Sequence, residues 1–205
     1  MGRKEYYTTL FFMTSIAIFC GSSEGYSECY RETAYALGNI IAERGMRVVY
    51  GGARIGLMGA VADGALDNDG EVIGVIPHFL RTKEVTHEGL TELLLTDTMH
   101  ERKVKMHELS DAVITLPGGW GTMEEMFEML TWGQLGLHQK PMGMLNVNGF
   151  YDSLRGLADM MVAEGFLKQE IRDMLLFSES IDELLEMMDS YIAPDVPKWV
   201  TKKTT

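Results

Sequence analysis

Three glycine-rich turns carry the residue types and spacing that point most directly to ligand binding. They are Cys20-Gly21-Ser22-Ser23, Gly51-Gly52-Ala53-Arg54-Ile55-Gly56-Leu57-Met58-Gly59 and Pro117-Gly118-Gly119-Trp120-Gly121-Thr122. Each follows a short apolar run and precedes a segment with helical periodicity. Because glycine has no Cβ, backbone N–H groups can converge there, and the N-terminus of the following helix adds partial positive charge. The turns predict an anion site built from backbone amides, with Ser22, Gly52 and Met58 among its binding residues.

The glycine spacing excludes the two most familiar nucleotide motifs. The second turn reads G-x-x-x-G-x-x-G from Gly52, whereas a dinucleotide-binding turn reads G-x-G-x-x-G. In the third turn, Glu124 stands where that motif needs glycine or alanine. No G-K-S or G-K-T sequence follows either turn. The lysine that binds the phosphates in ATP-type phosphoryl transfer is therefore missing, which argues against that activity. A mononucleotide or a sugar phosphate remains the predicted ligand.

Thr122 and Glu125 admit two interpretations. T-x-x-E is the spacing of a capping box, in which both side chains bind backbone N–H groups of the first helical turn. The same spacing recurs at Thr98–Glu101 and at Ser180–Glu183, so spacing alone favours a structural role. The glycine turn in front, however, directs this helix terminus toward the ligand site. A carboxylate there would repel a phosphate, so Glu125 is expected to face an uncharged group such as the ribose hydroxyls.

Two further charged groups are expected near these turns. Arg102 and Lys103 open a predicted helix, where the helix macrodipole disfavours cations. Anion binding explains this placement, and a solvated helix face shared with Lys105 explains it equally well, so both interpretations stay open. Glu124 and Glu128 are expected to lie mainly on the polar surface.

The turns need a scaffold that brings strand ends together, and the alternation of apolar runs and helical segments predicts one. The predicted strands are Ile16–Cys20, Arg47–Tyr50, Val72–Ile76, Leu93–Thr96, Ala112–Leu116, Met142–Leu145 and Leu175–Phe177. The predicted helices lie near Ser27–Arg44, Leu57–Asn68, His100–Leu109, Met123–Leu135, Tyr151–Glu164, Gln169–Met174 and Ile181–Met188. This alternation is typical of the α/β class and predicts a Rossmann-like, doubly wound parallel sheet in a single domain. We expect the domain to span residues 13–191, between a loose N-terminal extension (1–12) and a C-terminal tail (192–205).

Composition narrows the class of partner. The chain has 18 Lys and Arg against 30 Asp and Glu, a formal charge of −12, which argues against nucleic acid because phosphate attraction supplies most nonspecific affinity. Two cysteines predict a reduced, cytoplasmic setting. The N-terminal apolar run is interrupted by Thr and Ser, so neither a signal peptide nor a membrane span is expected. The five histidines are scattered without ligand spacing, and we predict no metal site.

Five segments together form a distinctive set. They are Cys20-Gly21-Ser22-Ser23, Val49-Tyr50-Gly51-Gly52 with Gly56-Leu57-Met58-Gly59, Gly74-Val75-Ile76-Pro77, Met99-His100-Glu101-Arg102-Lys103 and Pro117 to Glu125. In this order they resemble the LOG family of cytokinin riboside 5′-monophosphate phosphoribohydrolases, and the resemblance runs from about Ile16 to Ile181. It implies a Rossmann-like homodimer without a cofactor. It also implies hydrolysis of the N-glycosidic bond of a nucleoside 5′-monophosphate, AMP or an N6-prenylated AMP, to the free base and ribose 5-phosphate.

The resemblance also assigns roles to individual residues. Arg102 and Glu125 correspond to the catalytic pair. The phosphate would be held by Gly118, Gly119, Gly121 and Thr122, and the substrate site would be lined by Lys103, Glu84 and Thr131. In the family dimer, both subunits contribute to the active site. Ala53 stands where the family commonly has glycine, while Gly56 and Gly59 are retained.

A function of another class also fits such a fold. Some relatives of it bind nucleotide-like groups such as molybdenum cofactor without hydrolysis, so a non-catalytic carrier is the alternative hypothesis. The presence of both Arg102 and Glu125 favours the enzyme. A pyridoxal-phosphate-dependent lysine decarboxylase, which an older name of the family suggests, has no support because no lysine stands in a recognisable Schiff-base setting.

Overall fold

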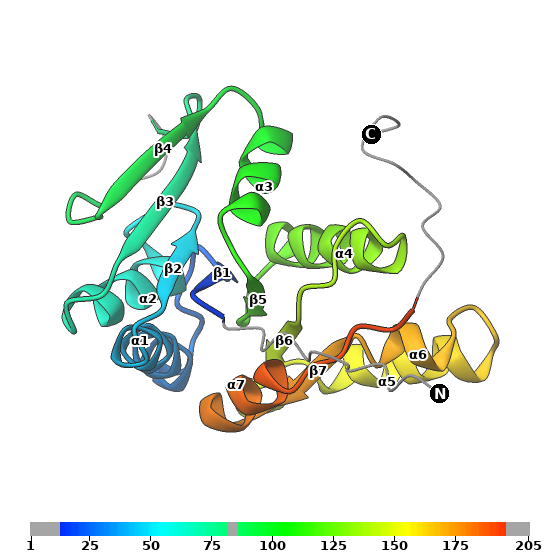
Figure 1. The fold of residues 1–205 in the computed structure, drawn as a ribbon. Helices are drawn as coiled ribbons and strands as arrows, with labels where there is room; N and C mark the ends of the chain where they lie inside the picture. The colour runs from blue at the N-terminus through cyan, green and yellow to red at the C-terminus, as the bar shows by residue number, and fades with distance from the viewer. Residues whose placement is uncertain (1–12, 82–85, 196–205) are drawn as a thin grey trace, which may run out of the picture.

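Seven parallel strands form one sheet, in the order β4-β3-β2-β1-β5-β6-β7 (Figure 1). The structure is a computed structural model that describes residues 13–81 and 86–195. The strands are β1 (Ser15–Phe19), β2 (Arg47–Tyr50), β3 (Val72–Pro77), β4 (Glu92–Thr96), β5 (Ala112–Thr115), β6 (Met142–Leu145) and β7 (Leu175–Ser178). The helices are α1 (Glu28–Glu43), α2 (Gly56–Leu66), α3 (Met99–Glu108), α4 (Trp120–Gln134), α5 (Asp152–Ala163), α6 (Gln169–Arg172) and α7 (Ile181–Asp189), with a short 3-10 turn η1 (Val147–Gly149).

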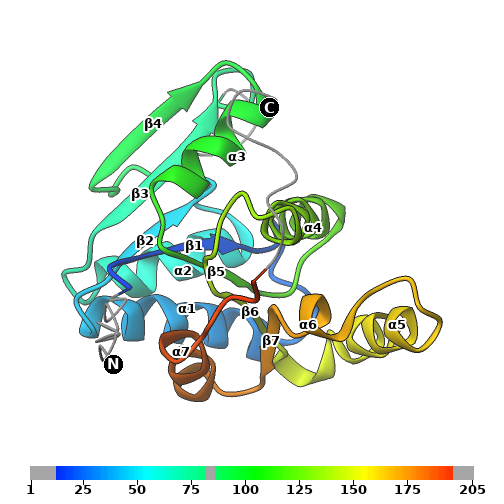
Figure 2. The same cartoon turned by 45° about the vertical axis from the view of Figure 1, so that its right-hand side comes forward.

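Helices cover both faces of the sheet, as the two-sided apolar strands require. Along β1, Ile16 and Ile18 face one way and pack in the core shared with α1, α2 and α7. Ala17 and Phe19 face the other way and pack in the core that includes residues of α3 and α4. Figure 2 shows these two helical layers on opposite sides of the strands. The predicted α/β, doubly wound fold is confirmed.

The predicted elements are also confirmed, with shifts of a few residues at their ends. One shift bears on function. Helix α4 begins at Trp120 rather than at the predicted Met123, because Gly119 takes an extended conformation (φ −93°, ψ −155°) and serves as the N-cap. The third glycine turn is therefore partly helical, and its last residues form the first turn of α4.

The sheet order creates a crevice at one point of its carboxyl edge. β1 pairs with β2 on one side and with β5 on the other, so the chain winds outward from β1 in opposite directions. Ligands of open α/β sheets bind where the winding reverses, beyond the carboxyl ends of the strands. The first and third glycine turns follow β1 and β5, and the Gly21 N–H donates a 3.0 Å hydrogen bond to the Pro117 carbonyl.

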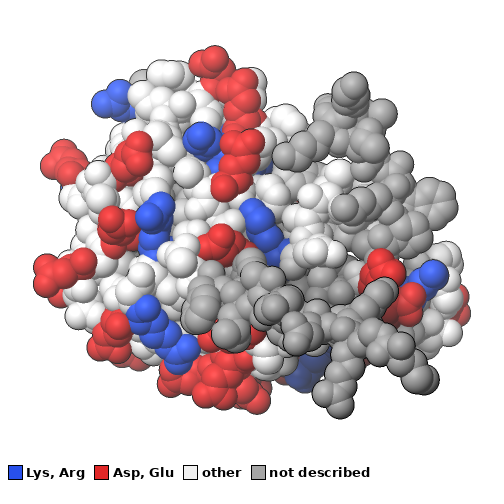
Figure 3. Space-filling model, in the orientation of Figure 1, with Lys and Arg blue, Asp and Glu red and all other residues white. Residues whose placement is uncertain are grey.

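The surface carries the acidic excess of the composition. On the face shown in Figure 3, Lys and Arg side chains lie among Asp and Glu side chains, with no continuous basic area in the described part of the chain. None of the helices in residues 13–81 and 86–195 is long and apolar enough to cross a membrane.

Candidate active site

The three glycine turns touch one another at the carboxyl edge of the sheet. A Cβ on Gly56 would lie 2.2 Å from the carbonyl carbon of Ser22, and one on Gly118 would lie 2.9 Å from the Gly21 nitrogen. The Leu57 N–H, at the start of α2, donates to the Gly21 carbonyl at 3.0 Å. Gly56 also has a φ of +62°, a conformation that other residues rarely adopt. Glycine at these positions lets three backbone segments meet without side chains between them.

The start of α4 leaves open space beside the third turn. A Cβ on Gly118 would meet Thr122 Oγ1 at 2.1 Å, so Gly118 packs directly against the Thr122 side chain. By contrast, a Cβ on Gly119 or Gly121 would meet no atom within 4 Å. The first N–H groups of a helix have no partner within it and carry partial positive charge. Open space next to such donors suits an anionic group.

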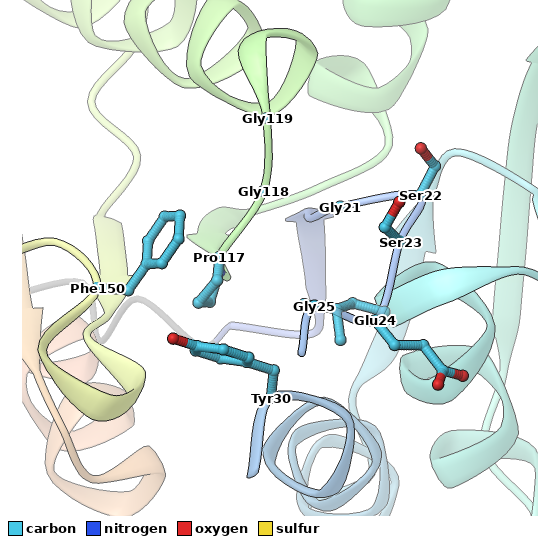
Figure 4. Close-up of a pocket in the computed structure, with 11 residues that line it drawn as sticks. Gly21, Ser22, Ser23, Glu24, Gly25, Tyr30, Pro117, Gly118, Gly119 and Phe150 are labelled. Atoms are coloured by element: carbon cyan, nitrogen blue, oxygen red, sulfur yellow. The ribbon is translucent and has the colours of Figure 1, made fainter. Parts of the chain in front are cut away.

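A cavity of about 320 Å³ lies at the same edge (Figure 4). Its walls come from the turns after β1 and β5 and from two aromatic rings; the lining residues are Gly21, Ser22, Ser23, Glu24, Gly25, Tyr30, Leu57, Pro117, Gly118, Gly119 and Phe150. The rings of Tyr30 and Phe150 meet edge to face with centroids 6.1 Å apart. Ser22, Gly118 and Gly119, three of the predicted binding residues, line this cavity, whereas Arg102 and Glu125 do not.

Arg102 and Glu125 form a buried pair between α3 and α4. The two residues are 6% and 9% exposed, and Arg102 Nη1 lies 3.7 Å from Glu125 Oε1. Arg102 Nε donates to the Val75 carbonyl at 3.0 Å, and Nη2 donates to the Gly51 carbonyl at 3.3 Å. Two carbonyl groups of the β2–β3 region therefore orient the guanidinium, and the predicted catalytic residues come together.

Gly51 makes this arrangement possible. A Cβ at Gly51 would lie 2.1 Å from Arg102 Nη2 and 2.9 Å from the Met58 sulfur. The guanidinium and Met58 thus pack against the bare backbone of the second turn. Gly52, the next residue, has a φ of +78°, and its carbonyl accepts a 3.1 Å hydrogen bond from the His87 N–H. The second turn supports Arg102 and is anchored at Gly52.

The charges of Arg102 and Glu125 both affect the pKa of Cys20, which follows β1. Burial raises the pKa of its thiol, the Glu125 carboxylate raises it further, and Arg102 lowers it. A thiol with a raised pKa stays protonated at neutral pH and is a poor nucleophile. Cys20 therefore acts as a buried apolar residue beside the site.

Lys103 is held by two carboxylates of α4. Its Nζ lies 2.5 Å from Glu124 Oε1 and 2.8 Å from Glu128 Oε2, and its side chain is 8% exposed. Burial lowers the pKa of Lys103, but the hydrogen bonds and charges of Glu124 and Glu128 outweigh that effect and the pKa is raised. The expectation that Glu128 is polar surface is wrong, since its side chain is only 22% exposed. The i, i+4 spacing of Glu124 and Glu128 is visible in the sequence and places both side chains on one side of α4. Their partner, Lys103, lies on another helix, and the sequence does not indicate that contact.

The structure decides against the capping-box interpretation of Thr122 and Glu125. Gly119 is the N-cap of α4 and no side chain caps this helix, so Thr122 and Glu125 are its third and sixth residues. The boxes predicted at the other two positions do form their first bond: Thr98 accepts from the Glu101 N–H, and Ser180 accepts from the Glu183 N–H. Thr122 and Glu125 are both buried in the site region instead.

Thr131, one of the predicted substrate residues, lies outside this cluster. Thr131 is exposed, donates to the Phe127 carbonyl at 2.7 Å within α4, and lines a separate groove between α4, α5 and α6. Glu84 lies outside the described residues. In residues 13–81 and 86–195, no group of three or more His, Cys, Asp or Glu side chains is placed to hold a metal ion.

Comparison with known proteins identifies the family. The profile of the family described as "Possible lysine decarboxylase" matches residues 58–188. The chain is 45% identical over 177 residues to the cytokinin riboside 5′-monophosphate phosphoribohydrolase LOG of Oryza sativa subsp. japonica, covering 86% of this chain and 73% of the relative. It is 42% identical over 193 residues to the LOG2 enzyme of Arabidopsis thaliana, covering 93% and 91%. This chain belongs to the LOG family.

Solved structures share the fold of this LOG-family chain at low sequence identity. The molybdenum cofactor binding protein from Rippkaea orientalis superposes with a TM-score of 0.65 and 24% identity, covering 86% of this chain and 95% of that one. The molybdenum cofactor carrier protein from Chlamydomonas reinhardtii gives a TM-score of 0.62 with 17% identity over 84% and 93% of the chains. These likenesses establish the architecture alone.

Proposed function

We propose that this protein hydrolyses the N-glycosidic bond of a nucleoside 5′-monophosphate of the cytokinin riboside type, releasing the free base and ribose 5-phosphate. The observation that carries the proposal is the buried Arg102–Glu125 pair, with 3.7 Å between the charged groups, next to an open glycine turn at the start of α4. The family relatives named above are enzymes of this activity. The chain is therefore a hydrolase acting on N-glycosyl bonds.

The phosphate is bound by the third turn. The backbone N–H groups of Gly119 to Thr122 and the hydroxyl of Thr122 supply donors without a net positive side chain. This matters because the described charged side chains around the site are two cations, Arg102 and Lys103, against four carboxylates, Glu24, Glu124, Glu125 and Glu128. The side chains do not make the site locally positive, so backbone dipoles bind the anion.

Glu125 acts on the sugar. Cleavage of a ribose–base bond passes through a transition state with positive charge at the anomeric carbon. The Glu125 carboxylate stabilises that charge by accepting hydrogen bonds from ribose hydroxyls, and it orients the attacking water. The water oxygen bonds to C1′ as the C1′–N bond breaks, and the departing base takes up a proton. Arg102, which lies against Glu125, grips the phosphate or assists departure of the base.

Phosphate binding positions the sugar against Glu125. Binding energy from a part of the substrate that does not react holds the reacting part in place. A nucleoside without its 5′-phosphate should therefore react far more slowly than the monophosphate.

The decisive experiment measures ribose 5-phosphate release from AMP and from an N6-prenylated AMP. We expect the wild type to turn over and Glu125→Ala to lose about 10²–10⁴-fold in kcat, the usual contribution of a positioned acid or base. Glu186→Ala, which removes an exposed carboxylate of α7, is the matched control and should behave as the wild type. Unchanged turnover in Glu125→Ala would refute the assigned role. Binding of AMP by the wild type without base release would favour the carrier function instead.

We further propose that the protein is a cytoplasmic homodimer and that the second subunit uses the α4–α5–α6 groove. This groove of about 190 Å³ is lined mainly by apolar side chains, including Phe127, Leu154 and Met161. Thr131 lies in the same groove, away from Arg102 and Glu125, so a role of Thr131 in substrate binding requires a second copy. Sedimentation should give twice the chain mass of 23.0 kDa, and Phe127→Glu should shift the protein toward the monomer. A wild-type monomer would contradict the dimer.

A further inference from the structure

We propose that Lys103, Glu124 and Glu128 form a clamp that positions Glu125 opposite Arg102. This inference rests on the proposed function, because it assigns Lys103 to the alignment of the catalytic pair rather than to the phosphate. We call the three residues the Lys103 clamp. Its members are positioning residues that act through Arg102 and Glu125.

The clamp joins α3 to α4 with one buried cation and two carboxylates. Glu124 and Glu128 are one helical turn apart on α4, so their side chains lie on the same face of the helix. Both reach the Lys103 ammonium on α3, at 2.5 Å and 2.8 Å. The Lys103 side chain is 8% exposed and that of Glu128 is 22% exposed, so this contact is shielded from solvent more than a surface ion pair is. Shielded pairs with close geometry are costly to break, because one partner is left as a buried charge.

The clamp is directly connected to the catalytic pair through the chain. Lys103 follows Arg102 on α3, and Glu124 precedes Glu125 on α4. Arg102 points toward the sheet, where it binds the Val75 and Gly51 carbonyls, whereas Lys103 points toward α4. The clamp contacts therefore fix how α3 and α4 lie against each other, and this same arrangement places Glu125 opposite Arg102.

The contact within the catalytic pair is longer than the contacts of the clamp. The separation of 3.7 Å between Arg102 Nη1 and Glu125 Oε1 exceeds the ~2.7–2.9 Å of a charge-assisted hydrogen bond. Arg102 is held by the Val75 and Gly51 carbonyls, and Lys103 is held by two carboxylates of α4. The shorter contacts of Lys103, one residue away on each helix, hold α3 and α4 together at the point where Arg102 and Glu125 meet.

The same contacts make Lys103 a poor phosphate ligand. Its ammonium already faces two carboxylates, so the three side chains together carry one net negative charge. A substrate phosphate would have to displace a carboxylate and would meet the repulsion of the other. The backbone donors of the third turn are not occupied in this way.

Variants that remove charges from the clamp test the inference. A positioning role should lower kcat for AMP, whereas a role in binding the phosphate should raise KM. Lys103→Met leaves Glu128 partly buried without its cation, and we expect kcat to fall about 10–100-fold, since a misplacement near 1 Å can cost as much. KM should stay within about threefold, because ground-state binding of the phosphate is untouched. The double variant Lys103→Met with Glu128→Leu removes both charges and fills the space with apolar groups. It should recover most of the lost kcat, as replacement of a buried ion pair by apolar residues often does for stability.

Controls make the outcomes distinct. Glu128→Gln keeps the side-chain shape, removes one charge and should also lower kcat at unchanged KM; it serves as the test if Lys103→Met fails to fold. Arg47→Met breaks the 2.9 Å Arg47–Glu71 pair at the amino end of β2, far from the site, and should leave both constants unchanged. A large rise in KM in Lys103→Met without recovery in the double variant would overturn the clamp and make Lys103 a phosphate ligand. Absence of base release by the wild type would instead overturn the proposed function itself.

Discussion

Arg102 shows how backbone groups can orient a side chain that is proposed to be catalytic. Its guanidinium donates to two carbonyl oxygens and packs against Gly51. Arginine suits this role because its planar fork presents fixed donors, which a lysine does not have. The position of the cation is thus set by the ends of β2 and β3 as much as by its own helix. A change in the backbone partner should therefore act on catalysis without touching a charged residue.

Gly51→Ala tests this dependence. The added methyl group would lie 2.1 Å from Arg102 Nη2, so the guanidinium must move. We expect kcat/KM for AMP to fall about 10–100-fold, as for other misplacements near 1 Å, with the protein still folded. Steady-state kinetics and a thermal unfolding curve on the same sample provide the measurement.

Gly156→Ala is the matched control. Gly156 lies in α5, and a Cβ there would meet no atom within 4 Å. Alanine in an exposed helix interior is favoured over glycine by about 1 kcal/mol, which for a chain of this size raises Tm by about 2–4 °C. Activity should not change. If Gly51→Ala and Gly156→Ala had the same activity, the role of the bare Gly51 backbone would be wrong.

At the scale of elements, α3 and α4 build the site together. α3 supplies Arg102 and Lys103, and α4 supplies Thr122, Glu125 and the two clamp carboxylates. Further along the pair, Trp132 of α4 packs edge to face on His107 of α3, with ring centroids 5.6 Å apart. His107 also lies 4.9 Å from the His138 ring. The helices are therefore joined by charges near the site and by aromatic rings away from it.

The ring cluster makes this helix pair sensitive to acid. Burial, together with the charges of Lys140 and His138, lowers the pKa of His107 from 6.5 to about 3. The folded protein thus disfavours the protonated ring, whereas the unfolded chain binds a proton near its ordinary value. The stability that the neutral His107 contributes is present above about pH 6.5 and is lost as the pH falls toward 3.

Replacement of His107 by Phe should weaken this acid sensitivity. Phenylalanine keeps a ring against Trp132 but takes up no proton. Between about pH 7 and about pH 4.5, we expect Tm to fall by several degrees more in the wild type than in His107→Phe. The reason is that only the wild type loses the stability that depends on keeping the His107 ring neutral. Thermal unfolding at both pH values measures the difference. Equal falls would show that His107 does not carry the effect.

At the scale of the whole molecule, a charge of −12 surrounds a site for an anion. On the face shown in Figure 3, acidic side chains lie interspersed with basic ones. The overall field therefore repels a nucleoside monophosphate, and the backbone donors of the third turn act only at short range. Such a site suits one phosphate and does not suit a polyanionic strand.

The salt dependence of catalysis should reflect this arrangement. Raising the ionic strength from about 0.01 M to about 0.15 M shortens the screening length from about 30 Å to about 8 Å. Screening weakens the repulsion between substrate and protein, so kcat/KM for AMP should stay constant or rise. Activity measured in a series of NaCl concentrations tests this expectation. A severalfold fall would indicate that exposed cations guide the substrate instead.

The sequence alone was sufficient to predict the seven strands, the alternating helices and the three glycine turns. These features depend on local periodicity and on the special conformations of glycine, which neighbouring residues encode. The capping boxes at Thr98 and Ser180 were predictable for the same reason. The motif resemblance added the pairing of Arg102 with Glu125, which the structure brings to 3.7 Å.

Other features were decided only by the tertiary structure. The order of the sheet places β5 beside β1 and so brings the first and third turns into contact. The extended Gly119 starts α4 one turn earlier than predicted, which excludes a capping box at Thr122. The partners of Lys103 on α4, the carboxylates of Glu124 and Glu128, also emerged only from the structure. Each of these depends on contacts between residues distant in the chain, and local sequence patterns carry no information about which distant surfaces will meet.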